Sequence, residues 1–214
     1  MTRHSVFDPG CRACPRLARH LAAVRREHPE YHAAPVPPFG DRNARLVVVG
    51  LAPGMHGANR TGRPFTGDHA GILLYETLHR FGFASRPEAL HARDGLRLRN
   101  CRITNAVKCL PPGNKPLPDE VTRCNGYLKA ELLALRPGSV LLALGLVAHA
   151  AVLKAYALRV KDYRFAHGAE HRLPGGIALL DSYHCSRYNT QTGRLTAAMF
   201  RRVVRRAGAL VARP

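Results

Sequence analysis

Residues 46 to 68 read Leu-Val-Val-Val-Gly-Leu-Ala-Pro-Gly-Met-His-Gly-Ala-Asn-Arg-Thr-Gly-Arg-Pro-Phe-Thr-Gly-Asp, and this stretch decides the fold. The short apolar, β-branched run from Leu46 to Val49 is typical of a parallel strand that is covered on both faces. A long glycine-rich loop follows it and ends at Asp68. Irregular backbone beyond the carboxyl end of a parallel strand is where open α/β sheets bind ligands. We therefore expect a ligand site in this loop.

The rest of the chain alternates apolar runs with helical patterns. Further strands are predicted at residues 102–107, 139–144 and 177–180. Helices are predicted after Pro15, at residues 71–83, from Pro118 onward, at residues 145–156 and at residues 194–210, whereas 84–100 reads as a short helix with a turn and 157–175 as loop. Short strands separated by helices predict an α/β fold. We expect a three-layer α/β/α sandwich with a central four-stranded parallel sheet, in one domain over residues 1–214.

The chain is strongly basic, with 33 Lys and Arg residues against 14 Asp and Glu residues and a formal charge of +19. Such a charge favours a polyanionic partner, and nucleic acid is the first choice. The alternative is a solubility feature of an arginine-rich proteome, and composition does not distinguish DNA from RNA. No apolar run approaches the roughly 20 residues that span a bilayer. Because Met1 to His4 lead into no apolar signal core, we expect a cytoplasmic protein.

Four of the six cysteines form a C-x2-C pair, Cys11 and Cys14, followed much later by a C-x14-C pair, Cys109 and Cys124. In a cytosolic chain such spacing indicates a metal site before it indicates disulfides. Four thiolates suit either a [4Fe–4S] cluster or zinc, and spacing alone does not decide between them. The alternative is four separate buried cysteines. The remaining Cys101 stands at a strand start and is expected to pack in the core.

Several runs of the 46–68 stretch match one known pattern in order and without gaps: Gly50-Leu51-Ala52-Pro53, His56-Gly57, Asn59-Arg60-Thr61-Gly62-Arg63 and Phe65-Thr66-Gly67-Asp68. They resemble motif 1 of the uracil-DNA glycosylase superfamily, and more narrowly its broad-specificity B-type branch, family five. Ser182-Tyr183-His184 resembles motif 2, although Cys185 stands where the family usually has proline. The resemblance extends over residues 11 to 200.

This resemblance implies a monofunctional DNA repair enzyme that hydrolyses uracil from DNA and also accepts other deaminated bases such as hypoxanthine. It implies a structural [4Fe–4S] cluster on Cys11, Cys14, Cys109 and Cys124, because the branch carries a run like Lys108 to Asn114 at this place. It also implies a monomer that acts on double-stranded DNA with a flipped-out base.

Two residues are expected to carry the chemistry. Asp68 would position water or stabilise the sugar cation, and its alternative role is the N-cap of the next helix. His184 would donate a hydrogen bond to the leaving base. A single histidine is more often structural, but His184 follows a strand inside the motif-like run.

The base pocket and the DNA surface follow from the same resemblance. Phe65 would stack on the extruded base and Asn105 would bind its edge; the alternatives are core packing and a satisfied polar group at a strand end. The backbone that completes the pocket comes from Gly50, Leu51, Ala52 and Pro53, with His56 facing it. The minor-groove segment comprises Ser186, Arg187, Tyr188 and Asn189, with Arg187 or Tyr188 filling the gap in the duplex.

Two other functions compete with this one. A non-catalytic iron–sulfur protein that binds nucleic acid and senses damage would keep the charge and the cysteines, and Cys185 favours it. A strict uracil enzyme of the thermophile type is disfavoured by Ala52, where that branch carries an acid beside the glycine.

Overall fold

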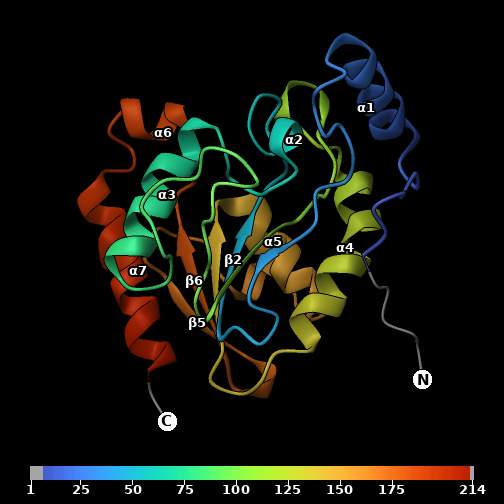
Figure 1. The fold of residues 1–214 in the computed structure, drawn as a ribbon. Helices are drawn as coiled ribbons and strands as arrows, with labels where there is room; N and C mark the ends of the chain where they lie inside the picture. Colours follow the sequence, from blue (N-terminus) through green and yellow to red (C-terminus); the bar gives the residue numbers. More distant parts are fainter. Residues whose placement is uncertain (1–6, 213–214) are drawn as a thin grey trace.

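The computed structural model describes residues 7 to 212, and the expectation about Met1 to His4 lies outside them. Helices lie on both sides of a six-stranded sheet (Figure 1). The strands are β1 (Phe39–Gly40), β2 (Leu46–Gly50), β3 (Cys101–Asn105), β4 (Val140–Leu144), β5 (Glu170–Leu173) and β6 (Ile177–Ser182). Their order across the sheet is β1-β3-β2-β4-β6-β5.

The four predicted strands are confirmed, and they form the parallel centre β3-β2-β4-β6. Strands β1 and β5, which were not expected, add antiparallel edges beside β3 and β6. Strand β5 lies inside the segment 157–175 that was expected to be loop. Its sequence, Glu-His-Arg-Leu, contains one apolar residue. An edge strand that packs so little apolar surface carries no pattern that distinguishes it from loop.

The helices are α1 (Pro15–Glu27), α2 (Ala58–Thr61), α3 (His69–Arg80), α4 (Pro118–Leu133), α5 (Leu146–Ala155), α6 (Arg187–Gln191) and α7 (Ala197–Val211), with 3-10 turns at Pro112–Asn114, Val160–Asp162 and Pro174–Gly176. Helices α3 and α7 pack on one face of the sheet, and α4 and α5 pack on the other (Figure 1). The predicted three-layer sandwich is therefore confirmed. No helix within residues 7–212 is long and apolar enough to cross a membrane.

Strand β2 is buried over its whole length because it supplies both cores. Leu46 and Val48 face α3 and α7, whereas Val47 and Val49 face α4 and α5. The alternation of a strand directs successive side chains to opposite faces, so a strand between two helix layers is apolar throughout. The carboxyl ends of β2, β3 and β6 consequently open at one edge, beyond which lie α2 and α6 (Figure 1).

Two segments differ from the expectation in their local structure. Residues 84–100 contain no helix and are held by an isolated bridge between Ala84 and Leu98. Helix α6 was not expected, because its five residues are too few to show a helical period; Ser186 caps it by accepting from the Asn189 backbone amide at 3.4 Å.

A buried ion pair fastens the loop after β2 to the connection between α3 and β3. Arg63 donates to the two carboxylate oxygens of Asp94 at 2.9 and 2.6 Å, and both side chains are 5% exposed. Arg63 also donates to Thr66 Oγ1 at 2.8 Å, and Asp94 accepts from the backbone amides of Leu90 and Leu96. Burial alone would raise the pKa of Asp94, but these bonds hold it well below its usual range.

We predict that Asp94→Asn lowers the free energy of unfolding by about 3 kcal/mol at neutral pH, because it leaves the buried Arg63 charge unpaired. The folded-state pKa of Asp94 is depressed, so its stabilisation is complete above an unfolded-state pKa of about 4 and is lost as the pH falls through the folded value. Urea unfolding at several pH values should show the difference between wild type and variant shrinking below about pH 4.

The control is Glu170→Gln, which breaks an exposed pair with Arg206. We expect it to cost less than about 1 kcal/mol. An equal loss in the two variants would contradict the special role of the buried pair.

Candidate active site

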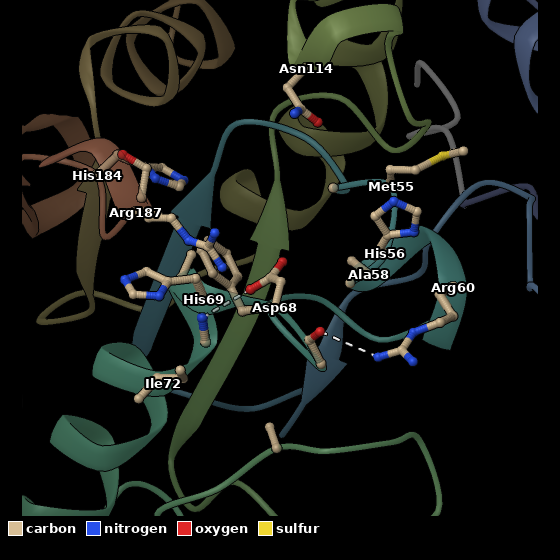
Figure 2. Close-up of a pocket in the computed structure, with 18 of the residues that line it drawn as sticks. Met55, His56, Ala58, Arg60, Asp68, His69, Ile72, Asn114, His184 and Arg187 are labelled. Carbon is tan, nitrogen blue, oxygen red and sulfur yellow. Dashed lines mark hydrogen bonds between the residues drawn. The ribbon is translucent and has the colours of Figure 1, made fainter. Parts of the chain in front are cut away.

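A cavity of about 1300 Å³ opens at the carboxyl edge of the sheet (Figure 2). It brings together most of the residues that the sequence assigned to a site: Leu51, Ala52, Phe65, Asp68, Asn105, His184, Ser186 and Arg187, and also His56. Gly50, Pro53, Tyr188 and Asn189 are not among the lining residues. The loops after β2, β3 and β6 therefore meet in one pocket, as the parallel order of these strands requires.

Asp68 serves as a helix cap and faces the cavity at the same time. Its Oδ1 accepts from the Gly71 backbone amide at 3.0 Å, which caps α3. Its Oδ2 lies so close to Gly57 that a Cβ there would approach it to 2.3 Å. Burial raises the pKa of Asp68, and the amides of Gly71 and Ala70 oppose the rise. Figure 2 shows the carboxylate among the pocket residues. The two roles considered from the sequence are thus compatible.

Phe65 forms a flat wall against His184, with the ring centroids 5.8 Å apart and the planes inclined by 30°. Its backbone has a φ of +54°, a region that side chains other than glycine rarely adopt and that concentrates at functional sites. Tyr75 donates to the preceding carbonyl of Pro64 at 2.7 Å. Only glycine fits at position 71, because a Cβ there would lie 1.9 Å from the Phe65 carbonyl oxygen.

Gly50 does not line the pocket itself but lies against two residues that do, Asn105 and Phe65. A Cβ on Gly50 would come within 2.4 Å of Asn105 Oδ1 and 2.6 Å of the Phe65 ring. Only glycine therefore allows these two side chains to meet at the end of β2.

Asn105 lines the cavity and carries an unsatisfied acceptor. Its Oδ1 is buried and has no hydrogen-bond partner among residues 7–212. A buried acceptor without a partner costs roughly 1–3 kcal/mol, so its presence in a cavity wall indicates a ligand that donates a hydrogen bond there.

His184 is a neutral imidazole at physiological pH. Burial lowers the pKa of His184 to about 4. Its backbone carbonyl accepts from Asn189 Nδ2 at 2.8 Å, so Asn189 holds the loop and does not line the pocket. Cys185, in the place of the usual proline, is fully buried in the core beneath α3 and α7. Arg187 reaches the pocket from α6, whereas Tyr188 is exposed outside it.

Sequence reasoning did not assign some of the lining residues. Asn114 reaches the cavity from the turn Pro112–Asn114 with a φ of +58°, and its Pro-Pro-Gly-Asn turn was read only as a neighbour of Cys109. His69 lines the pocket while its Nε2 lies 2.9 Å from Thr190 Oγ1, which links α3 to α6. Met55 and Arg60 come from the motif 1 loop itself (Figure 2).

The four predicted metal-ligating cysteines surround a second cavity, of about 120 Å³. Burial, together with the other three thiols, raises the pKa of Cys109 to about 12. The Lys108 backbone amide donates to Cys124 Sγ at 3.2 Å. Among residues 7–212, the only group of three metal-ligating side chains whose ligand atoms all lie within 4.8 Å of one another is found elsewhere, so no three of these thiols lie that close together. Thiolates of tetrahedral zinc lie about 3.8 Å apart.

That other group consists of His149, His171 and Asp181, which support the end of β6. Asp181 lies 2.8 Å from His149 Nδ1 and 3.2 Å from His171 Nε2. His149 Nε2 donates to the Tyr163 carbonyl at 2.8 Å. These hydrogen bonds tie α5 and β5 to the strand that delivers His184.

The chain matches one known protein family over most of its length. A model of the uracil DNA glycosylase superfamily matches residues 37–208. This chain belongs to the uracil DNA glycosylase superfamily. The predicted α/β fold and the resemblance of motif 1 to this superfamily are both confirmed.

Curated relatives show which branch of the superfamily this chain resembles. A Type-5 uracil-DNA glycosylase from Thermus thermophilus is 50% identical over 204 residues, which cover 92% of each chain. One from Pyrobaculum aerophilum is 45% identical over 93% of this chain and 88% of its own length. A Type-4 uracil-DNA glycosylase from Archaeoglobus fulgidus is 41% identical, but over only 51% of this chain. The resemblance to family five is therefore confirmed.

We predict that His184 titrates near pH 4, because its burial disfavours the charged imidazolium. Histidine side-chain NMR across pH 3 to 9 measures this directly, and a His184→Gln variant assigns the signal. A titration near the ordinary value of about 6.5 would show that the ring is solvated and not enclosed.

Proposed function

We propose that this protein is a DNA repair glycosylase that hydrolyses the N-glycosidic bond of uracil, and of other deaminated bases such as hypoxanthine, in double-stranded DNA. The observation that carries the proposal is one pocket lined by Asp68, by His184 stacked on Phe65, and by Asn105, whose Oδ1 has no hydrogen-bond partner among residues 7–212. The relatives named Type-5 uracil-DNA glycosylase support the uracil substrate. The enzyme works as a monofunctional monomer.

The base enters the pocket by leaving the duplex. Phe65 offers an aromatic face for stacking, and Asn105 Oδ1 accepts a hydrogen bond from an N–H of the base. Both partners are fixed in advance, since Gly50 allows them to approach and the Arg63–Asp94 pair holds the loop. Their preorganisation reduces the entropy that is lost when the base binds.

Bond cleavage develops positive charge on the sugar and negative charge on the departing base. The free Oδ2 of Asp68 stabilises the sugar cation or orients the attacking water, while Oδ1 stays bound to Gly71. The neutral His184 ring donates to the base oxygen as charge develops there. Because the pKa of Asp68 is raised, acid inactivates the enzyme at a higher pH than it would an exposed aspartate.

The composition of the pocket wall supports the proposal that bases other than uracil are accepted. Leu51 and Ala52 follow β2 where related branches carry an acid or Asn, and both line the cavity. An apolar wall leaves no polar group unpaired when the wrong base enters, so it rejects such bases poorly.

DNA is held by positive charge around the pocket. The chain carries a formal charge of +19, and Arg60 and Arg187 line the cavity itself. The segment Ser186–Asn189 enters the minor groove beside the lesion. Phosphate contacts of this kind make binding salt-dependent.

A structural [4Fe–4S] cluster on Cys11, Cys14, Cys109 and Cys124 fits the second cavity. The volume of about 120 Å³, and the finding that no three of the thiols lie within 4.8 Å of one another, suit a cluster better than a single zinc ion. When bound, the cluster supplies covalent links between the start of α1, the loop after β3 and helix α4.

We predict that Asp68→Asn and His184→Ala each lower the turnover of a uracil-containing duplex by roughly 100-fold or more while duplex binding remains. Asp68→Asn keeps the helix cap, because Asn caps as well as Asp, and so removes only the charge. Alkali-induced strand scission and free-base release measure the turnover, with hypoxanthine as the second substrate.

The matched control is Asp162→Asn, an exposed carboxylate paired with Arg159 outside the pocket. Full activity of Asp68→Asn would overturn its assigned role. A wild-type protein that binds duplex but releases no base would instead support the damage-sensing alternative.

For the cluster, we predict that protein purified without oxygen is brown and contains equal amounts of iron and sulfide, and that Cys109→Ser loses the colour. Cys101→Ala should keep it, because Cys101 is buried in the core under α3, away from the second cavity. Stoichiometric zinc without iron would refute the cluster assignment.

A further inference from the structure

Exposed apolar side chains gather around the mouth of the active-site cavity. Among residues 7–212, the three most exposed large hydrophobic side chains are Tyr188 at 70%, Ile72 at 66% and Leu90 at 61%. Ile72 and Leu90 line the cavity, and Tyr188 follows Arg187, which also lines it. Single exposed apolar residues are ordinary, but a group of them at a pocket marks a binding surface.

The tip that carries Leu90 is fixed from two directions. Asp94 accepts from the backbone amides of Leu90 at 2.9 Å and His91 at 3.3 Å. The carbonyl of Ala89 accepts from the Gly67 amide at 2.9 Å. Arg63 binds Asp94 from the motif 1 loop. The backbone at Leu90 is therefore as firmly placed as the pocket wall, while its side chain remains in solvent.

The surroundings of Leu90 suit nucleic acid. The connection between α3 and β3 carries exposed basic side chains on both sides of the tip: Arg86, His91, Arg93, Arg97 and Arg99. Its acids are Glu88 and Asp94, and Asp94 is already paired with Arg63. Figure 1 shows this green connection reaching the end of the sheet where α2 and α6 lie. Leu90 thus lines the same cavity as Arg187 of α6, but from a different segment of the chain.

We propose that Leu90 inserts into the base stack beside the flipped nucleotide, as a second wedge in addition to Arg187 or Tyr188. An apolar wedge unstacks a base step at a cost of a few kcal/mol. Because the backbone at Leu90 is already held in place, no entropy of ordering the loop adds to that cost. The inference rests on one part of the proposed function, the extrusion of a nucleotide from the duplex into the pocket, and it does not require bond cleavage.

The first test compares uracil excision from a duplex and from a single strand of the same sequence. Leu90→Ala should lower kcat/KM on the duplex about tenfold and leave the single strand within about twofold, because only the duplex has a stack to open. Leu90→Met should restore most of the duplex activity. Leu133→Ala, which truncates an exposed leucine on α4, is the matched control.

The second test is independent of excision. A duplex carries a stable abasic-site analogue with 2-aminopurine as the neighbouring base, and its fluorescence rises when that base unstacks. Wild-type protein and Leu133→Ala should raise the fluorescence at saturation, and Leu90→Ala should not.

Each other outcome has a definite meaning. Equal loss of activity on both substrates would show that Leu90 only maintains the loop. Unchanged duplex activity would indicate that the exposed apolar side chains bind a protein partner instead. Either result overturns the wedge. If wild-type protein excises nothing but the fluorescence rise still depends on Leu90, the proposed function fails and the wedge stands.

Discussion

The site depends on the close approach of three elements at Gly50, where β2 ends. Phe65 returns from the far side of the motif 1 loop, and Asn105 ends the neighbouring strand β3, and both lie against a residue that has no Cβ. This contact brings an aromatic face and an unpartnered amide oxygen to the same wall. The parallel pairing of β2 with β3 and β4 determines which loops arrive there. The order of the strands and the absence of a Cβ at Gly50 together define the pocket.

Strands β2, β4 and β6 could be predicted because each contains an apolar run that supplies two cores. Strand β5 and helix α6 could not, since one is a polar edge and the other is too short to show a period. Among the site residues, Asp68 and His184 follow strands inside recognisable motifs. Asn114 and His69 carry no such signal: Asn114 ends a 3-10 turn and His69 begins α3, and both line the pocket.

Long-range pairings were beyond sequence reasoning for a different reason. Arg63 reads as one arginine in a basic motif, and Asp94 reads as one acid in a polar connection. Their bidentate contact appears only in three dimensions, and it explains why a connection without helix or strand still has a defined path. The same holds for His149 and Asp181, which are separated by 32 positions in the chain. Polar side chains reveal their partners only once the apolar framework is known.

Asp68 joins folding to chemistry in one side chain, and this has an evolutionary consequence. One carboxylate oxygen caps helix α3 while the other faces the pocket. Most replacements would damage both properties together, so selection for a stable helix also protects the charge. Asparagine is the exception, because it caps a helix without being ionised. A protein descended from this one could therefore lose bond cleavage and keep the recognition of damaged bases through the single substitution Asp68→Asn, without loss of the helix cap.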